Sequence, residues 1–107
     1  MMVAKLHKIA ERKSSPDRLQ DKDGLDVLRL LRSAETVHLA GTLAKLAEHS
    51  IAGDATRQAR VFLQEHFGDR EGIGAQLAVR ASVGLEDAAT IAISCEALAR
   101  RLLGAWK

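Results

Sequence analysis

Apolar residues near the end of the chain recur at steps of three and four positions. The residues that set this rhythm are Ala88, Ile91, Cys95, Leu98 and Leu102. Such steps place side chains on one face of an α-helix, whereas the buried residues of a strand alternate along the sequence. The spacing therefore predicts a helix over about 86–104.

The rest of the chain is equally favourable to helix. Alanine, leucine, arginine and glutamate dominate, β-branched residues are sparse, and the sequence has one proline and no tyrosine. Apolar periodicity predicts further helices over about 2–12, 24–32, 36–49, 55–67 and 75–83. The residues expected to cap or end them are Ser33, Asp54, Gly68 and Gly84. "KSSPDRLQD" around Pro16 and the glycine-rich "GDREGIG" are predicted loops. We predict an all-α fold, a compact bundle of about five to six helices in a single helical domain over 1–107.

The composition is that of a globular chain which builds its core without disulfides or metal. It has 107 residues, of which 47% are hydrophobic and 28% charged. No apolar run approaches the roughly 20 residues that span a bilayer, so we expect no membrane segment and no signal peptide. The single cysteine, Cys95, cannot form an internal disulfide, and no histidine stands near it in the sequence. We expect it to be a small buried residue in a reduced, cytoplasmic protein.

The net charge of +2 is unevenly distributed along the chain. Up to Arg32 there are eight basic side chains and five acidic ones, whereas the remainder has eight basic and nine acidic. The positive excess thus lies in the first third, where it indicates either an anionic partner or a solvated helix face.

No metal or cofactor site is expected. Asp21 and Asp23 form an Asp-x-Asp pair, but they follow an irregular loop and open a helix, and no third carboxylate supports them. We interpret Asp23 as a helix N-cap, with Asp26 in the first turn and within reach of Arg29. The four histidines show no spacing of three or four and no accompanying cysteine, so they predict no metal site.

Nucleic-acid binding by this domain alone is also not expected. The stretch "LAKLAEHSIAGDATRQARVFL" suggests a helix-turn-helix, but its turn is long, and Arg57 and Gln58 stand where the second helix needs apolar packing. The few aromatic residues, two phenylalanines and one tryptophan, do not supply a platform for base stacking.

The helix over 2–12 carries a basic ridge beside its apolar stripe. At about 100° per residue, Lys5, Lys8 and Arg12 fall within about 60° of one another. One explanation is that their long side chains cover the rim of the core while their charges stay in water. The other is that the ridge binds an anionic group.

Two charged segments follow one another within "AKLHKIAERKSSPDRLQDKDGLDVLRLL", residues 4–31. Lys5, Leu6 and Arg12 match the pattern Lys-Leu-x-Ala-x-x-x-Arg, with a lysine at position 8 in place of alanine. After a short loop comes a segment of the type Arg-Asp-x-x-Asp-Leu, followed by an apolar helix. The residues that match it are Lys22, which replaces the arginine, Asp23 and Asp26, with "VLRLL" after them. In both order and spacing the run resembles the helical half of the AbiEii-like nucleotidyltransferases, the toxin family of abortive-infection systems.

The resemblance implies a helical C-terminal domain that packs against a nucleotide-binding lobe. By carry-over from the family, Lys5 would face the nucleotide phosphates, and Asp23 and Asp26 would position Lys5, Arg12 or the substrate. Lys8 and Lys22 would support this basic face. The family's Gly-Ser segment and its metal-binding Asp-x-Asp on a strand have no counterpart in the sequence. We therefore do not expect the isolated chain to be an enzyme.

Two functions follow from this sequence as hypotheses. The first is a non-catalytic helical domain of, or a remnant related to, a nucleotidyltransferase-like protein, which completes a nucleotide cleft together with a missing N-terminal lobe. The alternative is a small helical interaction module that binds an acidic protein or nucleic acid through its basic N-terminal face. Neither hypothesis fixes the oligomeric state, and a homo-oligomer is compatible with both.

Overall fold

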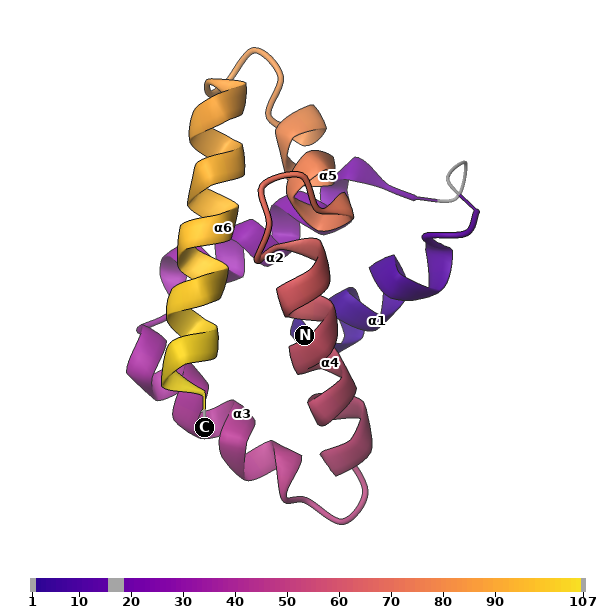
Figure 1. Ribbon diagram of the computed structural model, residues 1–107, viewed down its shortest axis with the longest axis vertical. Helices are drawn as coiled ribbons and strands as arrows, with labels where there is room; N and C mark the ends of the chain where they lie inside the picture. Colours follow the sequence, from indigo (N-terminus) through magenta and orange to yellow (C-terminus); the bar gives the residue numbers. More distant parts are fainter. Residues whose placement is uncertain (1, 16–18, 107) are drawn as a thin grey trace.

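The computed structural model describes residues 2–15 and 19–106, and within them it contains six α-helices and no strand (Figure 1). The helices are α1 Met2–Arg12, α2 Asp21–Ser33, α3 Thr36–Ala47, α4 Gly53–His66, α5 Ile73–Ala81 and α6 Ala88–Ala105. The predicted all-α bundle is confirmed. The break predicted at Pro16 lies outside the described residues, and α1 ends ahead of it.

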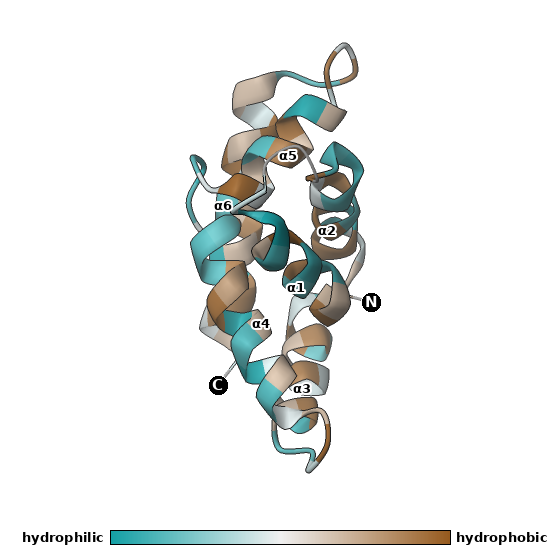
Figure 2. Cartoon of the chain, turned by 90° about the vertical axis from the view of Figure 1, so that its right-hand side faces the viewer, coloured by the Kyte–Doolittle hydropathy of each residue, from teal (hydrophilic) through white to brown (hydrophobic). Residues whose placement is uncertain are grey.

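Some of the helices run along the long axis of the molecule, and the others cross this axis or lie near its two ends. In Figure 1, α6 and α4 run lengthwise, α1 and α2 cross at mid-height, and α3 lies at the end opposite α5. α1 packs on both α4 and α2, and Figure 2 shows it lying across one face with a hydrophilic outer side. The first two helices are therefore neighbours.

The contact between α2 and α5 is the most extensive in the bundle, and it depends on a glycine. A Cβ atom on Gly24 of α2 would stand 2.5 Å from the Cβ of Leu77 and 2.6 Å from the carbonyl oxygen of Gly74, both on α5. Real Cβ atoms do not approach so closely, so a side chain at position 24 would force the helices apart. This close approach fixes the first turn of α2, which carries the candidate site.

One continuous core collects side chains from all six helices. Its fully buried members include Leu6 of α1, Leu28 of α2, Leu63 of α4, Leu77 of α5 and Ile91 of α6. α3 adds Ala40 and Leu43. Cys95 is also fully buried, as predicted, and burial raises the pKa of its thiol to about 11.

Several helix ends differ from the sequence-based prediction. α2 begins three residues early, at Asp21, because two carboxylates in its first turn favour the positive end of the helix dipole. α5 begins at Ile73, inside the predicted glycine-rich loop. Asp54 is not a cap: it lies within α4, which begins at Gly53. Gly84, by contrast, does adopt the left-handed conformation, with φ of 81°, in the turn after α5.

No helix among the described residues combines the length and the apolar character needed to cross a membrane. The longest, α6, has 18 residues, and several of them are charged or polar.

A candidate anion-binding edge on α1 and α2

A buried carboxylate joins α1 to α2. Asp23 has only 2% of its surface exposed, and Lys5 and Lys8 reach it from α1. Lys5 Nζ lies 3.0 Å from Asp23 Oδ1, and Lys8 Nζ lies 3.2 Å from Asp23 Oδ2. The two lysines are one helical turn apart on α1, beside the buried Leu6 and Ile9, so a single carboxylate can accept hydrogen bonds from both.

The interpretation of Asp23 as an N-cap is wrong. Gln20 occupies the N-cap position, and Asp23 is the third residue of α2. Its side chain pairs with the lysines of α1. The sequence alone favoured capping because it did not show that α1 would pack against this turn, which buries the carboxylate and brings cations to it.

The protonation equilibrium of Asp23 reflects two opposing effects. Burial, the larger single effect, favours the neutral acid and by itself would raise the pKa of Asp23. The hydrogen bonds from Lys5 and Lys8, together with their charges, outweigh it and hold the pKa of Asp23 below its ordinary value of 3.8. Hydrogen bonds to Asp23 and Asp26 likewise raise the pKa of Lys5. Asp23 and Lys5 are therefore both ionised near neutral pH.

Asp26 belongs to the same cluster. Its Oδ2 lies 3.0 Å from Lys5 Nζ, so Lys5 is shared between two carboxylates one turn apart on α2. Among the described residues, this lysine supplies the ion pair of Asp26, and the predicted partner Arg29 does not. The charges of Lys5, Lys8, Asp23 and Asp26 cancel, which leaves the cluster as a whole neutral.

The remaining predicted residues lie around this cluster. Arg12 is the last residue of α1, a turn beyond Lys8, and within the described chain Asp23 and Asp26 are paired by the two lysines. Lys22 is exposed in the first turn of α2. The structure thus brings together Lys5, Lys8, Asp23 and Asp26, with Lys22 at the rim.

A surface depression of about 490 Å³ opens beside the cluster. Its lining consists of Lys5, Lys22, Asp26, Arg29, Leu30 and Ser33. Three of these side chains are cationic and one is anionic, and Asp26 is already paired with Lys5. Lys22 and Arg29 are exposed, and neither makes an ion pair with any residue in the described part of the chain. They are the cations that this edge offers to a ligand.

The described residues contain no group of three histidine, cysteine, aspartate or glutamate side chains that could hold a metal ion. The two aspartates of the Asp-x-Asp pair have different partners, since Asp21 Oδ1 accepts a hydrogen bond of 3.0 Å from Arg80 Nε on α5. Because Asp23 pairs with lysines of α1 and Asp21 pairs with an arginine of α5, the two carboxylates do not form one set of metal ligands.

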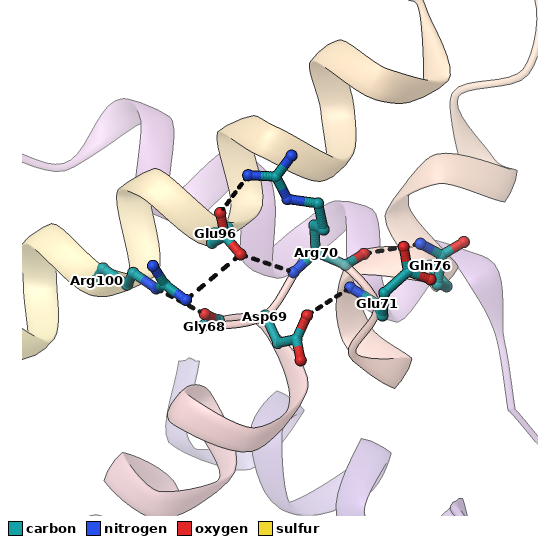
Figure 3. A network of polar contacts seen from close by, with 7 residues as sticks. All are labelled: Gly68, Asp69, Arg70, Glu71, Gln76, Glu96 and Arg100. Carbon is teal, nitrogen blue, oxygen red and sulfur yellow. Dashed lines mark hydrogen bonds and ion pairs between the residues drawn. The ribbon is translucent and has the colours of Figure 1, made fainter.

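Sequence reasoning missed a second polar cluster, centred on Glu96 of α6 (Figure 3). Its carboxylate accepts a hydrogen bond of 2.8 Å from Arg70 Nη2 and one of 3.3 Å from the backbone N–H of Arg70. Arg100 Nη2 lies 3.5 Å from the same carboxylate. These contacts fasten the segment between α4 and α5 to α6. Only the pair between Glu96 and Arg100, four residues apart on one helix, could have been predicted from spacing.

No protein-family model, curated protein or solved structure matches this chain. The likeness to AbiEii-like nucleotidyltransferases therefore rests on the two charged segments of residues 4–31.

Proposed function

We propose that this chain is a non-catalytic helical domain whose α1–α2 edge supplies cations to an anionic ligand held jointly with another lobe. The supporting observation is the depression beside the Asp23 cluster, where Lys22 and Arg29 carry charges that no described carboxylate pairs. The ligand that agrees with the family resemblance is a nucleotide, and the second lobe is then a nucleotide-binding one. The relation to abortive-infection toxins is part of the same proposal.

The residues on this edge have different roles in the proposal. Lys5 is held by two carboxylates at 3.0 Å, so a phosphate would have to compete with both for its ammonium group. Its role is to position Asp26 and the wall of the depression. Lys22 and Arg29 are the phosphate ligands, because their charges are unpaired among the described residues and Arg can bind an oxyanion through two parallel hydrogen bonds.

The second candidate function is docking of an acidic protein segment at the same depression. The observation that favours it is the mixed lining, since Leu30 adds an apolar surface beside the cations Lys22 and Arg29. An acidic peptide with an apolar side chain would use both, whereas a bare phosphate would use the cations alone. In either case we propose a cytoplasmic setting, in which the buried Cys95 stays reduced.

The experiment is an NMR titration of the ¹⁵N-labelled chain with ATP and, separately, with a glutamate-rich peptide. We expect saturable shifts of backbone amides in α1 and α2, and we expect Lys22→Glu/Arg29→Glu to abolish them. The matched control is Lys45→Glu/Arg101→Glu, which reverses two exposed charges on α3 and α6 and changes the net charge equally. Binding should survive in this control.

The two candidates differ in which ligand binds more tightly at equal ionic strength. A preference for ATP supports the nucleotide cleft, and a preference for the peptide supports the docking module. If the control pair weakens binding as much as the α2 pair, the attraction is only that of overall charge, and both candidates fail.

A further inference from the structure

A second hollow lies between α4 and α6. Its volume is about 470 Å³, and its lining consists of Arg60, Gln64, Gly68, Arg100, Leu103 and Gly104. Two of these side chains are guanidinium groups, one is a neutral amide, and none is a carboxylate. The hollow shares no residue with the α1–α2 depression and does not depend on the function proposed for it.

Arg60 is held in place by groups that do not cancel its charge. Its Nη2 donates to the carbonyl oxygens of Leu103 and Trp106, at 3.3 and 3.2 Å, at the end of α6. Its guanidinium carbon also lies 5.8 Å from the centre of the Trp106 ring. No described carboxylate pairs with Arg60. Its orientation is therefore fixed before any ligand arrives, and no carboxylate among the described residues compensates its positive charge.

Arg100 is positioned in a similar way on α6. Its Nε donates to the carbonyl oxygen of Gly68 at 2.9 Å, which fixes the plane of the guanidinium (Figure 3). Its contact with Glu96 is the longer of that carboxylate's two ion pairs, 3.5 Å against 2.8 Å for Arg70. The neighbouring carboxylate, Asp69, accepts from the backbone N–H of Glu71 instead. Two cations thus share Glu96, and no side chain that lines the hollow carries a negative charge.

The remaining lining leaves room for a ligand. Outside its own helical backbone and its two chain neighbours, a Cβ atom on Gly104 would meet no atom within 4 Å, so the absence of a side chain there keeps this wall of the hollow open. Gln64 is exposed at the rim, where its amide can donate a hydrogen bond. Leu103 provides an apolar surface beside the two arginines.

We propose that the hollow between α4 and α6 is a binding site for a small oxyanion ligand, whose oxygens accept hydrogen bonds from Arg60, Arg100 and Gln64. Charge-assisted hydrogen bonds from guanidinium groups are among the strongest that a protein surface offers to such a ligand. Phosphate and carboxylate groups share this chemistry, and the ligand could carry either.

The test is a titration with inorganic pyrophosphate, followed through the Nε–Hε resonances of the arginines. We expect saturable shifts for Arg60 and Arg100 and none for Arg101. Arg100→Gln should lower the affinity roughly tenfold, because one charge-assisted contact is lost, whereas Arg101→Gln on the same helix should leave it unchanged. A parallel titration with acetate distinguishes the sources: shifts with both anions indicate a general oxyanion site, and shifts with pyrophosphate alone indicate a phosphate site.

Arg60→Gln also removes hydrogen bonds that tie α4 to α6, so a variant that keeps both arginines is needed. Gly104→Met fills the open wall, and we expect it to lower pyrophosphate affinity at least roughly tenfold. Gly41→Met is the matched control, because Gly41 is likewise exposed in a helix with no atom within 4 Å of a Cβ. Equal affinity in the two methionine variants, a loss in Arg101→Gln as large as in Arg100→Gln, or shifts with neither anion would overturn the proposal.

Discussion

The carboxylates of Asp23 and Glu96 each gather two cations, but they stabilise different parts of the molecule. Asp23 is almost fully buried and joins two helices through Lys5 and Lys8. Glu96 keeps 14% of its side chain exposed and joins a surface segment to α6 through Arg70, with Arg100 beside it. A fully buried charge that loses its partners cannot be hydrated, whereas a partly exposed charge such as that of Glu96 can. Ion pairs of similar length at the two clusters therefore contribute unequally to the stability of the fold.

The largest effect should come from removing both cations of the buried cluster. Lys5→Met/Lys8→Met keeps most of the length of the side chains but leaves the Asp23 carboxylate buried and without its two lysine partners. We expect the free energy of unfolding to fall by about 3 kcal/mol, measured by urea denaturation. The control Lys22→Met/Lys45→Met removes two exposed lysines and should change it by less than about 0.5 kcal/mol. Equal losses in the two pairs would mean that Asp23 is not buried.

The reactivity of the Cys95 thiol distinguishes a cluster that stabilises the whole fold from one that stabilises only a local segment. Its thiol is buried, and its pKa of about 11 makes it unreactive while the protein is folded. Lys5→Met/Lys8→Met should speed its modification by a disulfide reagent about a hundredfold, in proportion to the unfolded population. Glu96→Gln, although it alters the next residue along α6, should leave the rate nearly unchanged. A large acceleration in Glu96→Gln would contradict the distinction between the clusters.

The pH dependence of the contribution that Asp23 makes to stability should change sign when its two lysine partners are removed. In the wild type, the folded pKa of Asp23 lies below its ordinary value of 3.8, so the unfolded chain takes up the proton more readily. The contribution of Asp23 is thus present above pH 3.8 and is lost as the pH falls through the folded pKa. In Lys5→Met/Lys8→Met burial alone remains, the folded pKa of Asp23 rises, and the contribution of Asp23 to stability should increase as the pH falls. Urea denaturation between about pH 3 and 6 measures both slopes.

The smallest effect should follow from Glu96→Gln. The variant keeps the hydrogen-bond acceptor for the backbone N–H of Arg70 but loses the charge that pairs with its side chain. Hydrogen exchange should quicken at the amide of Gly72, which is bonded to the carbonyl oxygen of Asp69, and stay unchanged in the core of α6. Faster exchange throughout α6 would show that this surface cluster supports the whole bundle.

Sequence periodicity was sufficient to predict the helices because an amphipathic helix is determined by residues three and four positions apart. It placed Lys5 and Lys8 on one ridge, and the two charged segments pointed to Asp23 and Asp26. It could not predict that Asp23 would be buried, because that depends on α1 packing across the first turn of α2. For the same reason, the pairing of Asp26 with Lys5 rather than Arg29 became clear only in three dimensions.

The spacing of residues along the sequence could not predict contacts between residues that are far apart in the chain. Arg70 meets Glu96 across 26 positions, and Arg60 meets Trp106 across 46. One contact between residues close in the sequence was also not predicted. The Nδ1 atom of His49 accepts hydrogen bonds from the backbone N–H groups of Ile51 and Ala52, in the turn ahead of α4. A histidine in this role has no distinctive sequence pattern, unlike the serine and aspartate caps that the sequence suggested.

The proposed division of charges on the α1–α2 edge depends on the buried carboxylate of Asp23, because its pairing with Lys5 and Lys8 leaves Lys22 and Arg29 as the cations available to a ligand. The most direct measurement is a ¹³C NMR titration of the Asp23 side-chain carboxyl in the folded wild-type chain. We predict a pKa below the ordinary value of 3.8. A pKa above it would show that the two lysines do not hold this carboxylate, and the proposed division of charges on the α1–α2 edge would be wrong.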